Sequence, residues 1–167
     1  MGDGHQVCIH GKNRTEYLFA IINSYTREVV GIKHIGYHCT SQDVKIAIDF
    51  AFLDRGIMQI KNVRIRSDNV TRHVSRIVEL FLSTHNIAHY RIHPATRKEY
   101  AHIESFNSIL EKEVIRRFEF SSFEDAENTI SRFIAFYNNE RLHSAIDYKT
   151  PKKVYEKRKE NIIKGSA

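Results

Sequence analysis

The sequence has little cysteine, proline or glycine and no tryptophan. Its two cysteines, Cys8 and Cys39, stand apart, so they form neither a disulfide framework nor a CxxC pair. With two prolines and no Gly/Ser-rich linker, the chain is expected to form one domain. No apolar run approaches the ~20 residues that a membrane helix needs, and the first residues lack the features of a secretion signal. We therefore expect a cytoplasmic protein that does not contact a membrane.

Basic residues outnumber acidic ones, and the surplus lies near the C-terminus. Residues 141–167 hold eight Lys or Arg and three Asp or Glu, whereas residues 1–140 hold 18 and 17. Such a segment is attracted to nucleic acid phosphates, although a solvated helix end or tail has a similar composition. We therefore divide the chain into a core, residues 1–145, and a basic C-terminal extension, residues 146–167.

Hydrophobic periodicity predicts the order of the secondary-structure elements. Strands are expected over residues 5–10, 17–24, 27–36, 62–67 and 88–93. Helices are expected after a cap at Thr40 or Ser41, over residues 74–82, from residue 102, and after a capping box of Ser121 and Glu124. The order β-β-β-α-β-α-β-α-α predicts an α/β protein with a mixed five-stranded sheet flanked by helices, which is the order of the ribonuclease-H-like fold.

Apolar residues at helical spacing predict the buried side of each helix. These stripes are Val44, Ala47, Ile48 and Ala51; Val74, Ile77, Val78, Phe81 and Leu82; Ile103, Phe106, Ile109, Leu110 and Val114; and Phe123, Ala126, Ile130, Phe133, Ile134 and Tyr137.

Three carboxylates are candidates for a metal site. Asp68 follows a predicted strand, Glu104 lies near the start of a predicted helix, and Asp3 directly precedes the first predicted strand. A carboxylate at the carboxyl end of a strand points into the crevice where α/β sheets bind ligands. Carboxylates are the ligands that magnesium prefers, and two such ions suit an in-line displacement at phosphorus. Carboxylates in loops and at helix starts are also common on ordinary surfaces, so position alone leaves both interpretations open.

Four short motifs occur in a fixed order along the chain. They are Arg66-Ser67-Asp68-Asn69, then Ala101-His102-Ile103-Glu104-Ser105-Phe106, then Phe136-Tyr137-Asn138-Asn139-Glu140-Arg141-Leu142-His143, and finally Thr150-Pro151. Together they resemble the integrase core of bacterial insertion-sequence transposases, a family related to retroviral integrases. Ile9-His10-Gly11 and Arg27-Glu28-Val29-Val30-Gly31 match the first strands of that family, so the resemblance covers essentially the whole chain.

The resemblance implies a DDE transposase or integrase catalytic domain that cleaves DNA and transfers strands. Asp3, Asp68 and Glu104 match the catalytic and metal-binding acids, and two Mg²⁺ or Mn²⁺ ions are the implied cofactors. In this family, water exposes a DNA 3′-hydroxyl, which then attacks a target phosphodiester without a covalent enzyme intermediate. The implied partners are transposon-end and target DNA and other copies of the chain, as a homodimer or higher multimer, in the bacterial cytosol beside the nucleoid.

Basic and polar residues near the predicted crevice and in the extension are candidates for DNA binding. They are Arg66, Asn69, Arg97, Lys98, Lys112, Arg141, Lys152 and Lys153. A solvated surface charge is the competing interpretation for each basic residue. Two other functions stay open: a catalytically inactive transposon remnant that acts as a DNA-binding module, and a ribonuclease-H-type nuclease that cuts without joining.

Overall fold

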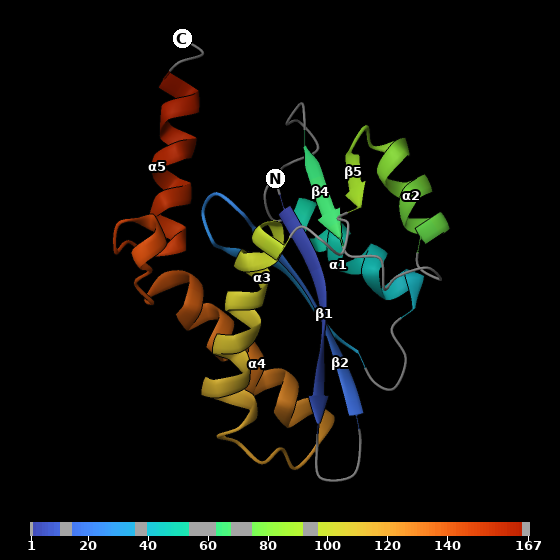
Figure 1. Ribbon diagram of the computed structural model, residues 1–167, viewed down its shortest axis with the longest axis vertical. Coiled ribbons are helices and arrows are strands. Elements are labelled where there is room, and N and C mark those ends of the chain that lie inside the picture. The colour runs from blue at the N-terminus through green and yellow to red at the C-terminus, as the bar shows by residue number, and fades with distance from the viewer. Residues whose placement is uncertain are drawn as a thin grey trace.

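The computed structural model describes residues 2–10, 15–35, 40–53, 63–67, 75–91 and 97–164 (Figure 1). Its side chains are described over residues 16–33, 40–52, 63–67, 76–90 and 101–161. The strands are β1 (Gly2–His10), β2 (Thr15–Asn23), β3 (Val29–Ile35), β4 (Arg64–Ser67) and β5 (Ala88–Arg91). The helices are α1 (Ser41–Leu53), α2 (Ser75–Thr84), α3 (Arg97–Leu110), α4 (Phe123–Asn139) and α5 (Pro151–Lys164), with a π-helical turn η2 (Glu111–Ile115) and a 3-10 turn η3 (Ser144–Ile146).

The five strands form one mixed sheet, in the order β3-β2-β1-β4-β5. β1 pairs antiparallel with β2, which pairs antiparallel with β3. On its other side β1 runs parallel to β4, and β4 runs parallel to β5. The predicted mixed five-stranded sheet is therefore confirmed, and β1 is its central strand.

Each face of the sheet has its own apolar core, because successive side chains of a strand point to opposite faces. Phe19 and Ile21 of β2 pack with α1 and α2, whereas Leu18, Ala20 and Ile22 pack with α3 and α4. Figure 1 shows these two pairs of helices on opposite sides of β1. Most of the predicted stripes are buried, but Ile77 and Phe123 are exposed by 52% and 41%, so their predicted burial is wrong; Val74 lies outside the described residues.

The face covered by α1 requires a glycine in β3. A Cβ atom on Gly31 would lie 2.7 Å from the carbonyl oxygen of Ala47 and 3.0 Å from Cβ of Ala51. A β-bulge lies next to this contact, because Ile21 pairs with Gly31 whereas Ile22 pairs with Val29, which leaves Val30 as the extra residue. The strand therefore changes register at the level of Ile22.

Side-chain caps define where two helices begin. At α1, Asp43 N–H donates to Oγ1 of Thr40, and Thr40 N–H donates back to Asp43, as a capping box does. At α4, the cap is Ser122, whose Oγ accepts from Asp125 N–H. Ser121 instead donates its N–H and its hydroxyl to the Asp125 carboxylate, and these bonds hold the pKa of Asp125 below its usual range. The predicted box of Ser121 and Glu124 is therefore wrong by one residue.

The C-terminal extension contains a helix. Asp147 and Tyr148 both have left-handed backbone angles, with φ of 57° and 54°, in the turn that joins α4 to α5. Thr150 is the residue before the helix, and Pro151 opens it, a position that proline favours. Within the described ranges, no helix is long and apolar enough to span a membrane.

Candidate active site

The first predicted ligand, Asp3, lies inside the central strand. In the register of the sheet it stands opposite Ile22 of β2 on one side and Arg66 of β4 on the other. The sequence placed it just before the strand; the strand begins at Gly2 instead, because pairing with two neighbours compensates for the weak strand propensity of Gly2 and Gly4. The side chain of Asp3 lies outside the described residues.

The second predicted ligand, Asp68, and the candidate Asn69 lie outside the described residues. The strand that leads to them is described and ends at Ser67, which pairs with Gly4 of β1. The hydroxyl of Ser67 lies 2.8 Å from Nε2 of His89 on β5, so the end of β4 is tied to the edge strand. The chain therefore enters Asp68 from a strand that runs parallel to β1, beside Asp3.

The third predicted ligand, Glu104, is exposed on α3. This helix begins at Arg97, five residues earlier than its apolar stripe indicated, and packs against β1 and β2 through Ile103, Phe106 and Leu110. Glu104 thus belongs to the helix that covers the same sheet face as Ile22, the strand neighbour of Asp3.

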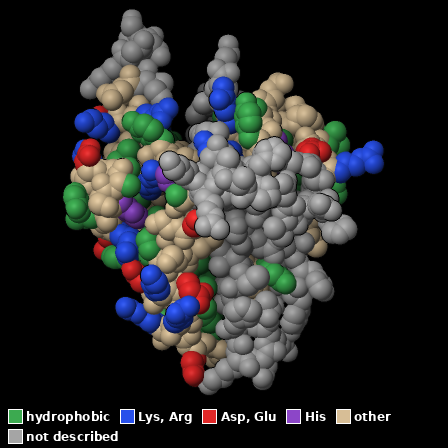
Figure 2. Space-filling view, in the orientation of Figure 1, with side chains coloured by type: hydrophobic (Ala, Val, Ile, Leu, Met, Phe, Trp, Pro, Cys, Tyr) green, Lys and Arg blue, Asp and Glu red, His purple; other side chains and the backbone are tan. Residues whose placement is uncertain are grey.

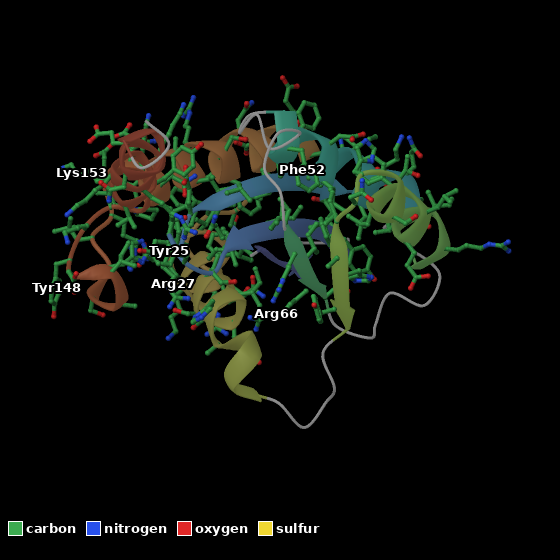
Figure 3. The ribbon with its side chains drawn as sticks, turned by 90° about the horizontal axis from the view of Figure 1, so that it is seen from above. Tyr25, Arg27, Phe52, Arg66, Tyr148 and Lys153 are labelled. Carbon is green, nitrogen blue, oxygen red and sulfur yellow. The ribbon has the colours of Figure 1, made fainter. Side chains whose placement is uncertain are left out.

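Arg66 is half-buried on that face. Its neighbour Ile65 packs with α1 and α2, so the alternation of the strand turns Arg66 toward the side of α3. Figure 3 shows Arg66 between the ribbons of β4 and α3. The face that carries the Asp3 position therefore also holds a guanidinium group, which suits contact with a phosphate.

The other candidate DNA-binding residues fall into different settings. Arg97 and Lys98 lie in the first turn of α3, with side chains outside the described residues, while Lys112, Lys152 and Lys153 are exposed. Arg141 is half-buried and forms an ion pair with Glu113 of η2, with Nη1 and Oε2 2.7 Å apart.

The motif from Phe136 to His143 supplies contacts that the sequence motif did not specify. Tyr137 is buried, with its ring edge-on to Phe106 of α3 at 5.2 Å between centroids. The side chain of Asn138 donates to the carbonyl of Val29 and accepts from its N–H, both at 2.9 Å. His143 packs edge-on against Tyr137 at 4.6 Å. These residues join the end of α4 to both α3 and β3.

Burial changes the protonation of this cluster. It raises the pKa of Tyr137 to about 12, against the opposing effect of the Arg141 and Arg27 guanidinium groups. It also lowers the pKa of His143, and the nearby Arg141 acts in the same direction. Both shifts favour the neutral form of the side chain.

Residues 85–151 match the family model described as the integrase core domain. The match covers this stretch of the chain. It contains Glu104 and the motif from Phe136 to His143, while Asp3 and Asp68 precede it. The predicted resemblance to integrase cores is thus confirmed.

A curated relative of this chain is an uncharacterized 39.2 kDa protein of insertion element IS476 from Xanthomonas euvesicatoria. The two are 29% identical over 125 residues, which is 75% of this chain and 35% of the relative. The chain therefore spans about a third of the length of the relative that it matches.

Solved structures with the same fold include viral integrase and transposase catalytic cores. The magnesium complex of the HTLV-2 integrase core has a TM-score of 0.69 and 17% identity, with 91% of this chain and 93% of that chain covered. The BIV integrase core has a TM-score of 0.71 and 14% identity, with 97% of each chain covered. The Mos1 mariner transposase core has a TM-score of 0.63 and 17% identity, with 80% of this chain and 69% of that chain covered. The chain therefore has the predicted ribonuclease-H-like α/β fold.

Among the residues with described side chains, no three His, Cys, Asp or Glu residues are close enough together to hold a metal ion. Of the three predicted ligands, Glu104 is among these residues, whereas the side chains of Asp3 and Asp68 are not. The donor chemistry of the three is uniform, because all are carboxylates, the ligands that Mg²⁺ and Mn²⁺ prefer. Asp3 lies on β1 and Glu104 lies on the helix packed against that strand, while Asp68 follows β4 in the sequence.

Proposed function

We propose that this chain is the catalytic core of a DDE transposase or integrase, which cuts DNA and transfers strands with the help of divalent metal ions. The observation that carries the proposal is the position of Asp3 in the central strand, beside β4, with the helix of Glu104 packed on the same strand. Asp68 follows β4 directly in the sequence. The family of residues 85–151 supports the same reaction class.

In this proposal, Asp3, Asp68 and Glu104 hold two Mg²⁺ or Mn²⁺ ions. When bound, such ions activate the attacking oxygen and stabilise the leaving oxygen of an in-line displacement at phosphorus. Arg66, on the α3 side of β4, binds the DNA phosphate and orients the strand. Water first attacks a phosphodiester of the DNA and breaks its P–O3′ bond, which frees a 3′-hydroxyl. This hydroxyl then attacks a phosphodiester of the target strand, forms a new P–O bond and displaces a target 3′-hydroxyl.

The partner in this proposal is DNA, and α5 extends the surface that binds it. Lys152, Lys153, Lys157 and Lys159 are exposed, and among the described residues none has an ion-pair partner. Arg158 stacks on the ring of Tyr25, with its Cζ 4.3 Å from the centroid. Because Tyr25 lies two residues after Asn23, which pairs with Gly2, this contact joins α5 to the end of the sheet that carries Asp3.

Figure 2 shows basic side chains at the base of α5 and, lower on the same side, basic and acidic side chains mixed. Phosphates are attracted by basic side chains and repelled by acidic ones, so the base of α5 is the part of this side that suits contact with DNA. We propose that several copies of the chain act together on DNA as a dimer or higher multimer. The HTLV-2 core, which shares the fold, is described in dimeric and trimeric forms.

The test of the reaction uses a labelled branched DNA that mimics a strand-transfer product, with Mn²⁺ or Mg²⁺. We expect Asp68→Asn and Glu104→Gln to lower the rate by at least about a hundredfold, because each removes a charged metal ligand. Glu127→Gln is the matched control, since Glu127 is also an exposed helical glutamate, on α4. Its rate should equal that of the wild type.

Full activity of Glu104→Gln would remove Glu104 from the site. A folded wild-type protein that neither reacts nor binds Mn²⁺ in calorimetry would favour the second function, a DNA-binding module without catalysis, for which the exposed lysines of α5 provide the surface. Products that are cut but never joined would instead indicate a nuclease.

A separate test addresses DNA binding by α5. The double variant Lys152→Ala/Lys153→Ala should reduce the slope of log K against log salt concentration by about two, one for each lost phosphate contact. Arg76→Ala, an exposed cation on α2, is the control and should leave the slope unchanged. Equal slopes for the wild type and the double variant would place the DNA elsewhere.

A further inference from the structure

We propose that Tyr137 and Asn138, at the end of α4, fix the position of the helix that carries Glu104 relative to the strands that carry Asp3. They act as positioning residues, since neither belongs to the predicted ligand set. The contacts that join α4 to β3 and to α3 are all between described residues. Their consequence for metal binding rests on the proposed function.

Asn138 acts as a one-residue extension of the sheet. Its amide makes two hydrogen bonds of 2.9 Å with Val29, one to the N–H and one to the carbonyl. β3 is an end strand, so these two groups face away from β2 and would otherwise lack a strand partner. A side-chain amide has one donor and one acceptor in the same plane, as a paired strand residue does. The end of α4 is therefore joined to β3 at one defined residue.

Val29 lies in the same row of paired residues across the sheet as Asp3, the first predicted ligand. Val29 pairs with Ile22, Ile22 pairs with Asp3, and Asp3 pairs with Arg66. The β-bulge at Val30 lies directly beside this row, and at a bulge the ladder is locally disrupted. The Asn138 amide thus holds the row at the place where the pairing of β2 and β3 is least regular.

Tyr137 makes the corresponding contact with the catalytic helix. Its ring is 2% exposed and packs edge-on against Phe106, two residues after Glu104 on α3. The ion pair between Arg141 and Glu113 holds the end of α4 to η2, the continuation of α3, with a separation of 2.7 Å. Two consecutive residues of α4 therefore contact two different elements, one the row of Asp3 and the other the helix of Glu104.

Apolar packing alone does not fix such an arrangement, because it is non-directional and permits sliding. Hydrogen bonds depend steeply on angle and distance, so the pair on Val29 permits one register. Removal of the Asn138 amide should leave the apolar core intact while the row of Asp3 shifts relative to α3. Carboxylates that share metal ions lose affinity when their spacing changes, whereas the fold survives.

The test compares Asn138→Ala with Ser122→Ala, which removes the cap at the opposite end of the same helix. Circular dichroism first establishes that both variants are folded at the assay temperature. Calorimetry with Mn²⁺ then gives the metal affinity without DNA, and the branched-DNA reaction gives the Mn²⁺ concentration at half-maximal rate. We expect Asn138→Ala to weaken Mn²⁺ binding at least about fivefold, somewhat less than for residues that touch metal ligands directly. Ser122→Ala should leave both quantities unchanged.

A conservative variant separates the amide from the volume of the side chain. Asn138→Gln keeps both the donor and the acceptor, so its Mn²⁺ affinity should lie closer to that of the wild type than to that of Asn138→Ala. Hydrogen exchange at the amide of Val29 should accelerate in Asn138→Ala and not in Ser122→Ala, because the alanine leaves that N–H without its acceptor.

The inference is overturned if Asn138→Ala binds Mn²⁺ as tightly as Ser122→Ala, or if Asn138→Gln is as impaired as Asn138→Ala. The failure of the proposed function looks different, because it appears in the wild type before any substitution. If the wild-type protein binds no Mn²⁺, or if Glu104→Gln leaves its Mn²⁺ affinity unchanged, the proposed metal site is wrong and Asn138 has no metal site to position.

Discussion

The two faces of the sheet are held in different ways. On the α1 and α2 face, Gly31 allows the backbone of α1 to approach β3, and the buried cluster of this face is apolar. On the α3 and α4 face, an equally apolar core is joined by the Asn138 amide and the Arg141–Glu113 ion pair. Among the described residues, the first face is held mainly by close apolar packing. The second face is also held by hydrogen bonds and an ion pair, whose geometry is directional. This difference indicates that the face with the predicted catalytic helix needs a defined register as well as a dense core.

The largest expected effect is that of Phe106→Ala on the α3 and α4 face. Phe106 is fully buried and contacts Tyr137, so its loss should lower the free energy of unfolding by about 3–5 kcal/mol. Phe52→Ala, on the other face, should cost less, because Phe52 is 7% exposed whereas Phe106 is 0% exposed. Urea unfolding monitored by circular dichroism measures both. An equal or greater loss in Phe52→Ala would contradict this comparison.

The next effect tests the close approach of the α1 backbone to β3. Gly31→Ala should lower the free energy of unfolding by about 1–3 kcal/mol, because the new methyl group meets the backbone oxygen of Ala47. Adding Ala51→Gly removes the second contact but not the first, so the double variant should stay destabilised. Recovery of the wild-type unfolding midpoint in the double variant would show that the backbone of α1 yields easily.

A smaller effect compares the helix caps of the two faces. Ser122→Ala should cost about 1 kcal/mol, since it leaves the N–H of Asp125 without its acceptor at 3.1 Å. Thr40→Ala on α1 should cost at least as much, because it removes both the bond that Thr40 accepts from Asp43 N–H and the bond that its hydroxyl donates to the Asp43 carboxylate. Thermal unfolding of the two variants side by side gives the order, and the reverse order would contradict the cap geometry.

The smallest effect concerns pH at the end of α4. Burial lowers the pKa of His143, so the unfolded chain binds a proton at this site more readily than the folded chain. Stability should therefore be highest above the ordinary histidine pKa of ~6.5 and should fall as the pH drops through it toward the lowered value. Because the side chain is partly exposed, the loss should be below about 1 kcal/mol. The measurement is urea unfolding at about pH 7.5 and pH 5, in the wild type and in His143→Gln. A difference of equal size in both proteins would assign the effect to other groups.

Periodicity predicted the mixed sheet, the element order and most of the core, because strands and helices with one buried face carry their period in the sequence. The prediction was wrong where two neighbouring residues were equally good caps, or where a helix began without an apolar stripe. Ser121 and Ser122 are both followed at three residues by an acid, so the pattern alone could not select Ser122. The first turns of α3 carry no apolar stripe, which hid five residues of that helix.

The candidate site shows the same limit. Motifs identified Glu104 and Asp68 in the sequence, but the row that joins Val29, Ile22, Asp3 and Arg66 depends on strand register and on a bulge. Asn138 was visible only as part of a motif, because its partner lies 109 residues away. Contacts between such distant positions follow from the packed fold, and one sequence does not carry them.

The order of elements along the chain has a consequence for synthesis. β1 to β3 end by Ile35, whereas the helices that cover Leu18 and Ile22 begin at Arg97 and end at Asn139. At roughly 5–20 residues per second, about 5–20 s separate the translation of these strands from that of their cover. During that time the nascent hairpins present an apolar surface with nothing to bury it. The yield of folded protein should therefore depend on the speed of the ribosome and on chaperones that shield the emerging sheet.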